Sequence, residues 1–179
     1  MTLSTAADFK SQLLALSPTT DPASGAAAFV GALAGFMNQT QAGSTGSPGI
    51  FTFNNAVMIP LMLAMLPVPD NSWIPIFVTN WTTAVTASII TPGTVMNPIW
   101  IGSASLDSNT LPTAAATIIT IPAATAALSA GLVSVPTASD KTLQFATSIR
   151  DATLAFTFLC IGLAAPPALT PIPIPISAQ

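Results

Sequence analysis

The sequence predicts a mainly α-helical protein of short apolar helices interrupted by prolines, followed by an extended proline-rich C-terminal arm. Three observations support this prediction: helix-capping residues precede several apolar stretches, prolines follow them, and apolar residues within them recur three or four positions apart. The chain has 179 residues, 17 of them proline, which is the size of one domain. We therefore expect one compact helical domain over residues 1–165 and an arm over residues 166–179.

Two helices are predicted near the N-terminus. Residues 2–16 form the first, which Ser4 or Thr5 can cap and a nearby proline ends. The second spans residues 21–38. It starts with Asp21 as the N-cap and a proline at the first helical position, where the missing N–H group costs no hydrogen bond.

The middle of the chain alternates predicted helices with breaks. Residues 39–49 are polar and rich in glycine and serine, which indicates a loop, and residues 50–53 favour a short strand. A third helix is predicted over residues 54–66, with a kink at Pro60. A fourth is predicted over residues 72–90, although the β-branched residues at its end fit a strand equally well.

The next segments have weaker signals. Residues 94–107 follow no helical or strand period, and Trp100 within them is a candidate anchor against a neighbour. Residues 111–135 are alanine-rich, which indicates helical material, and Pro122 is expected to break it.

The longest predicted helix covers residues 139–165, with Ser139 as its cap. Its second half, residues 152–165, carries no charge on any side, so we expect it to be buried all round. Arg150 and Asp151 are adjacent, and we expect them to point apart and meet other partners. The apolar stripe of this helix, two positions in every seven, consists of Phe145, Ile149, Ala152, Phe156, Leu159 and Leu163.

The arm alternates proline with isoleucine at Ile172, Ile174 and Ile176. Proline excludes a helix and cannot donate to a central strand ladder, so the arm is expected to be extended, polyproline-like or an edge strand. The three isoleucines are expected to dock in grooves, either on another subunit or on the same one.

The charge content constrains what the surface can be. Only 5% of the residues are charged, with three Lys+Arg and six Asp+Glu, against about 25% in an ordinary soluble domain. Charge keeps a surface hydrated and prevents association. We therefore expect much of this surface to be covered by copies of the same chain, by other proteins or by lipid.

The residue types that carry out chemistry are nearly missing. The chain has no His and no Tyr, a single Cys, and acids that are all Asp and scattered along the sequence. Acid–base catalysis, metal ligation and cofactor chemistry draw on such residues in clusters. We expect no enzyme activity, no cofactor, no metal and no small-molecule substrate. The net charge of −3 without a basic cluster also argues against nucleic-acid binding.

Two function hypotheses remain. The first is a non-enzymatic structural subunit of a large homo-oligomeric assembly, such as a virion or phage component, tube, filament or shell. Its partners would be copies of itself and other structural proteins of that assembly.

The alternative is an integral or lipid-contacting membrane protein with short apolar helices, because residues 22–69, 71–106 and 108–139 are free of charge. A spanning helix needs about 20 continuous apolar residues, however, and prolines interrupt the runs here. The N-terminus shows no cleavable signal peptide, so the expected location is within a large particle or at a membrane.

The candidate interface residues share small size at helical spacing, a large aromatic ring or an apolar position in the last helix or the arm. They are Gly31, Gly35, Trp73, Trp81, Trp100, Phe156, Leu159, Leu163, Ile172, Ile174 and Ile176.

Overall fold

The computed structural model describes residues 3–42, 46–47, 49–66, 72–91, 95–96, 118–163 and 171–177, and for most strand residues it describes the backbone alone. This part of the chain is mainly helical, which confirms the predicted fold class. Its helices are α1 (Ala6–Leu14), α2 (Pro22–Met37), α3 (Asn55–Met65), α4 (Trp73–Thr86), α5 (Pro122–Val133) and α6 (Lys141–Leu154), with a short 3-10 turn, η2, at Val135–Thr137.

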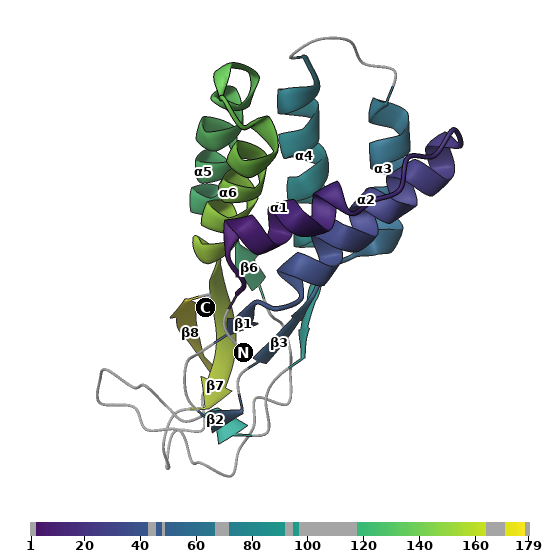
Figure 1. The fold of residues 1–179 in the computed structure, drawn as a ribbon. Coiled ribbons are helices and arrows are strands. Elements are labelled where there is room, and N and C mark those ends of the chain that lie inside the picture. The colour runs from purple at the N-terminus through teal and green to yellow at the C-terminus, as the bar shows by residue number, and fades with distance from the viewer. Residues whose placement is uncertain are drawn as a thin grey trace.

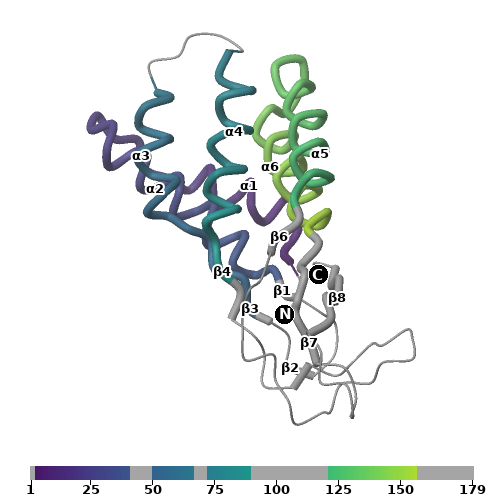
Figure 2. Tube along the Cα trace, turned by 180° about the vertical axis from the view of Figure 1, so that it is seen from behind, coloured from purple at the N-terminus to yellow at the C-terminus, as the bar shows by residue number. Residues whose placement is uncertain are grey.

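Three of the helices form a row. α4 lies between α3 and α5, and α6 packs beside α5 (Figure 1). α1 and α2 cross the row on one side, so that the view from behind shows α3, α4 and α5 in front (Figure 2). Two side-chain hydrogen bonds tie the row together. Asn80 on α4 donates its amide to the Leu61 carbonyl on α3 at 3.1 Å, and the hydroxyls of Thr82 on α4 and Thr125 on α5 lie 3.2 Å apart.

Local capping chemistry starts three of the helices as predicted. Thr5 and Asp8 form a capping box at α1, in which each side chain bonds the other's backbone N–H. Asp21 accepts hydrogen bonds from two backbone N–H groups at the start of α2, and Asn54 accepts one from Val57 at α3. Asp140, rather than the predicted Ser139, caps α6.

The strands are short and all their pairings are antiparallel. One sheet has the order β1–β3–β4, a second pairs β2 with β5, and a third has the order β6–β7–β8. Their bounds are β1 Gln41–Ala42, β2 Gly46–Ser47, β3 Gly49–Thr52, β4 Ile89–Thr91, β5 Val95–Met96, β6 Ile118–Thr120, β7 Thr157–Leu163 and β8 Pro171–Ser177.

The predicted helix over residues 139–165 is wrong in its second half. α6 ends at Leu154, and β7 then pairs with β6 and β8 over Thr157–Leu163. This stretch contains two β-branched residues and a phenylalanine, which favour a strand, and a glycine, which disfavours a helix. The predicted burial of a helix over residues 152–165 therefore does not apply.

Two other boundaries differ from the prediction. Pro122 does not interrupt a helix but begins α5 at its first position, where proline is tolerated. Residues 72–90 were predicted as a helix whose end fits a strand equally well, and both predictions are partly right. α4 continues to Thr86, and β4 starts at Ile89.

Aromatic side chains join the helices from inside. Phe9 of α1 stacks on Phe36 of α2 with ring centroids 4.4 Å apart. At the base of the helices, Phe156 lies 5.6 Å from both Trp81 and Phe51, centroid to centroid. A further cluster links α2, α4 and α6 through Phe29, Trp73, Phe77 and Phe145. Burying such rings is the largest single source of core stability.

Candidate functional site

Charge is unevenly distributed among the helices. Within the described ranges, the charged residues lie on α1, at the N-cap of α2, and at the cap and along the length of α6. Helices α3, α4 and α5 carry none. The described residues of the row of helices visible in Figure 2 thus carry no charged group, and neither do the helical residues of α2 after its cap.

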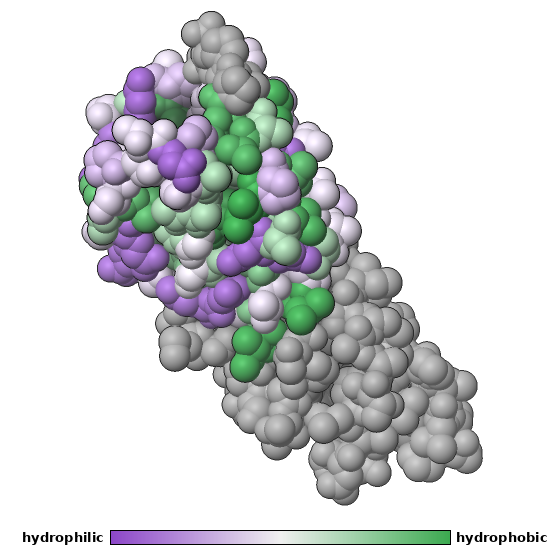
Figure 3. Space-filling model, turned by 90° about the vertical axis from the view of Figure 1, so that its right-hand side faces the viewer, coloured by the Kyte–Doolittle hydropathy of each residue, from purple (hydrophilic) through white to green (hydrophobic). Residues whose placement is uncertain are grey.

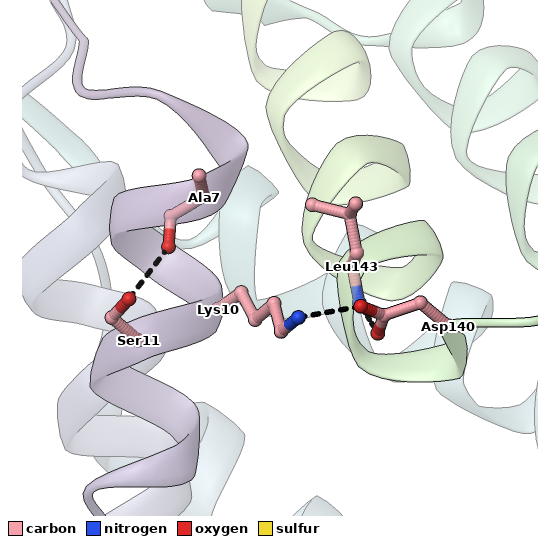
Figure 4. Close-up of polar contacts among 5 residues, drawn as sticks. All are labelled: Ala7, Lys10, Ser11, Asp140 and Leu143. Atoms are coloured by element: carbon pink, nitrogen blue, oxygen red, sulfur yellow. Dashed lines mark hydrogen bonds and ion pairs between the residues drawn. The ribbon is translucent and has the colours of Figure 1, made fainter.

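On the charged side, an ion pair connects two helices that are distant in sequence. Lys10 of α1 reaches the carboxylate of Asp140, which also accepts a hydrogen bond from the backbone N–H of Leu143 (Figure 4). The hydrogen bond from Lys10, followed by that from Leu143, lowers the pKa of Asp140 below its ordinary value.

A second ion pair corrects an expectation. Arg150 and Asp151 do not point apart: the Arg150 guanidinium lies 3.6 Å from the Asp151 carboxylate, and both side chains remain substantially exposed. Long side chains can bend toward each other even when their Cα atoms are adjacent on a helix. At this distance and exposure the pair contributes little to stability.

On the uncharged side, large apolar side chains stand in solvent. Val133 at the end of α5 is 66% exposed, Leu63 of α3 is 39% exposed and Ile76 of α4 is 37% exposed. In the view toward the α2–α3 side, hydrophobic side chains run down the middle of the molecule, interrupted by a hydrophilic group, and other hydrophilic side chains gather toward the left edge (Figure 3). An apolar patch of this kind marks an interaction surface more often than a bare solvent face.

The exposed threonine hydroxyls of α4 donate within the helix itself. The hydroxyls of Thr79, Thr83 and Thr86, all exposed residues, donate to the carbonyl oxygens four positions earlier at 3.0, 2.9 and 2.8 Å. Each hydroxyl proton therefore has a partner without water. Covering this helix would leave none of these three threonine donors unpaired, which lowers the usual penalty for burying polar groups.

We name this surface the uncharged face. It comprises the exposed surface of the three helices, which includes Pro60, Leu63, Ile76, Thr79, Thr83, Ala126, Ala130 and Val133.

The sequence prediction missed every one of these residues, because periodicity alone does not reveal which side of a helix is covered. The sequence does show that residues 55–65, 73–86 and 122–133 carry no charge. This lack of charge identifies the three helices but not which of their sides is exposed.

Two of the predicted interface residues lie in the interior of the chain. Trp81 has no exposed surface and Phe156 is 1% exposed, and the two rings stack on each other. They hold α4 against the end of α6, so their role as intersubunit contacts is corrected to an internal one. Their large apolar surface drives them into the nearest core.

The other predicted interface residues are placed differently. Trp73 is half-buried against Phe77 and Phe145. Gly31 and Gly35 lie on the exposed side of α2, where an added methyl group would meet nothing within 4 Å. Leu159 and Leu163 lie on β7, and Ile172, Ile174 and Ile176 on β8, where the backbone alone is described; Trp100 lies outside the described residues.

No chemical centre emerges from the described residues. They contain no group of three or more His, Cys, Asp or Glu side chains that could hold a metal ion. None of their helices has the length and hydropathy required to cross a lipid bilayer. No protein-family model matches the chain, and comparison with curated proteins and with solved structures finds no significant similarity. The candidate functional site is therefore a surface, the uncharged face.

Proposed function

We propose that this protein is a non-enzymatic structural subunit of a large assembly of copies of the same chain, together with other structural proteins of that assembly. The observation that carries the proposal is the uncharged face: three adjacent helices expose apolar and internally satisfied side chains and no charge. Leaving such a surface in water is unfavourable by about 25 cal/mol for each Å² of apolar area. Covering it with a like surface recovers that free energy.

The internal ion pairs fit the same proposal. Lys10 is paired with Asp140, and Arg150 lies near Asp151, which leaves Asp8, Asp21 and Lys141 as the described charges outside an ion pair. A subunit that meets its own copies needs shape and apolar matching rather than charge steering.

The experiment that tests this function is the mass of the protein extracted without detergent. Size-exclusion chromatography with light scattering, followed by negative-stain electron microscopy, should show particles many times the 18.1 kDa of one chain. A homogeneous monomer at a protein concentration of about 100 μM, well above the Kd of ordinary assembly contacts, would refute the proposal.

Lipid contact is the second candidate function. The hydroxyl-to-carbonyl bonds of Thr79, Thr83 and Thr86 favour it, since they satisfy polar groups as well in lipid as in a protein interface. Flotation of the detergent-free protein with neutral phosphatidylcholine vesicles distinguishes the two functions. An assembly subunit stays at the bottom of the gradient, whereas a lipid-contacting protein floats with the vesicles.

A further inference from the structure

We infer that β8 bonds to β7 through the backbone groups of its isoleucines alone, so that its outer edge lacks an N–H donor at every proline and no further strand can add there. The sheet β6–β7–β8 therefore ends at β8. This inference goes beyond the proposed function and does not depend on it, because it concerns a contact between copies that the backbone excludes.

β8 is a strand in which proline and isoleucine alternate. Its sequence is PIPIPIS over Pro171–Ser177, and every one of its residues has a partner on the antiparallel strand β7. In such a ladder, opposing residues alternate between pairs that exchange both N–H···O bonds and pairs that exchange none. Proline has no N–H group to exchange, so the bonded pairs are those that contain isoleucine. They are Phe158 with Ile176, Cys160 with Ile174 and Gly162 with Ile172.

The same alternation decides what the outer edge of β8 offers. The backbone groups of successive residues point to opposite edges of a strand, so the carbonyls of Pro171, Pro173 and Pro175 point away from β7. These positions offer acceptors without donors, and within β8 only Ser177, the last residue, has an N–H on that edge. The carbonyls of an added strand would face the prolines and lose water without a partner, which is unfavourable.

The prolines lie on the one described edge strand that is long enough to recruit another strand. The described edge strands other than β8 are β1, β2, β4, β5 and β6, and each has two or three residues. β8 has seven residues and lies beside β7 (Figure 1). Of all the described strands, β8 alone contains proline. Short strands and prolines are both ways in which proteins prevent pairing at a sheet edge.

The composition of this sheet makes such protection necessary. β7, with the sequence TFLCIGL, and β8 carry no charged residue. Uncharged segments of high strand propensity tend to stack into sheets between copies of a chain. Many proteins guard an edge with lysine, but the three basic residues of this chain, Lys10, Lys141 and Arg150, lie on α1 and α6. Proline at the outward positions excludes an added strand without any charge.

Amide hydrogen exchange tests how β8 is bonded. Because proline has no N–H, exchange within residues 171–176 of the full-length protein reports on the three isoleucine amides alone. Mass spectrometry should show that they exchange about tenfold or more slowly than in a free synthetic peptide of residues 164–179, since bonded amides exchange only when the structure opens. Equal rates in the protein and the peptide would overturn the inference.

The missing donors can be tested by chemical synthesis. The single cysteine, Cys160, allows a synthetic segment of residues 160–179 to be joined to residues 1–159 by native chemical ligation, which gives the full chain. One protein restores the outward N–H groups through Pro171→Ala, Pro173→Ala and Pro175→Ala. The matched control has N-methylalanine at the same three positions. It has the same side chain and also lacks the proline ring, but it has no N–H group.

The two synthetic proteins should behave differently. We expect the alanine protein to form thioflavin T-positive aggregates, with the reflection at about 4.7 Å that stacked strands give. Because restored hydrogen bonds favour strand addition, the concentration required should be about tenfold or more below that of the wild type. The N-methylalanine protein should aggregate no more readily than the wild type. Circular dichroism confirms the helix content, and Pro173→Ala alone, in the middle of β8, is the second variant in case the triple replacement does not fold.

Two results of this comparison would overturn the inference. If neither the triple nor the single alanine protein aggregates more readily than the wild type, the outer edge of β8 does not limit the growth of the sheet. If the N-methylalanine protein aggregates as readily as the alanine protein, the rigidity of the proline ring protects the edge, rather than the missing N–H. Both readings compare variants at one concentration, so they do not depend on the mass of the wild-type particle.

Discussion

The α1–α6 side and the uncharged face belong to the same helical region, yet they handle their surfaces in opposite ways. The first exposes charges and pairs two of them across helices, as Lys10 does with Asp140. The second has no charge and satisfies its hydroxyls within α4. Of the two, only the first keeps strongly hydrated charged side chains at the surface. Satisfied hydrogen bonds and good hydration are therefore separate properties of a surface.

The largest expected effect lies under the uncharged face. Trp81→Ala removes a completely buried ring that stacks on Phe156, and we expect a loss of about 3–5 kcal/mol in the free energy of unfolding. Chemical denaturation followed by circular dichroism measures it. Thr83→Ala, two positions along the same helix but exposed, is the control and should change stability by less than about 0.5 kcal/mol. Equal effects would show that the inward and outward sides of α4 are wrongly assigned.

A glycine comparison gives the next largest effect. At Gly131 of α5, an added methyl carbon would lie 2.5 Å from the Ser148 hydroxyl oxygen and 3.2 Å from the Ser148 Cα atom on α6. We therefore expect Gly131→Ala to destabilise the protein by about 1–3 kcal/mol, since backbone atoms of α6 must move. Thermal or urea unfolding checks this value.

The exposed glycines of α2 should respond with the opposite sign. Gly31→Ala and Gly35→Ala place a methyl group in open space, so each should stabilise the isolated chain by about 0.5–1 kcal/mol through lower backbone entropy in the unfolded state. A destabilisation measured on dissociated protein would contradict the open surface described for α2.

The smallest expected effect concerns the charged side. Lys10→Met removes the partner of Asp140, and we expect a small loss of stability at neutral pH that added salt reduces further. The pKa of Asp140 is lowered in the folded state, so the stabilisation is fully present above the unfolded pKa of about 4 and disappears as the pH falls through the folded value. Urea unfolding of both proteins across this range measures the difference. A gap that persists at low pH would show that packing, rather than charge, distinguishes them.

Much of the helical fold was predictable because its signals are local. Thr5, Asp21 and Asn54 sit at the starts of α1, α2 and α3 where capping rules place them. The end of α6 was not predictable in this way. The apolar residues after Phe156 fit both a helical stripe and a strand, and the structure resolves this by pairing β7 with distant strands.

The candidate surface was less predictable than the fold. Trp81 and Phe156 have the size and chemistry of interface residues, but the same properties place them in the core. Val133 and Ile76 are equally apolar and are left exposed because α5 and α4 turn other sides inward. Which apolar residue faces outward depends on how helices pack together, and no local pattern encodes that choice.

The self-bonded threonines of α4 have a consequence for how the assembled protein should respond to temperature and to solution conditions. A contact through the uncharged face removes water from methyl and methylene groups, and the described residues of this face bring no charged group into the contact. The free energy of such apolar burial weakens on cooling and strengthens in sulfate, whereas sodium chloride chiefly screens charges. Particles of this protein should therefore dissociate more readily in the cold and less readily in ammonium sulfate. Moderate sodium chloride should leave their dissociation nearly unchanged.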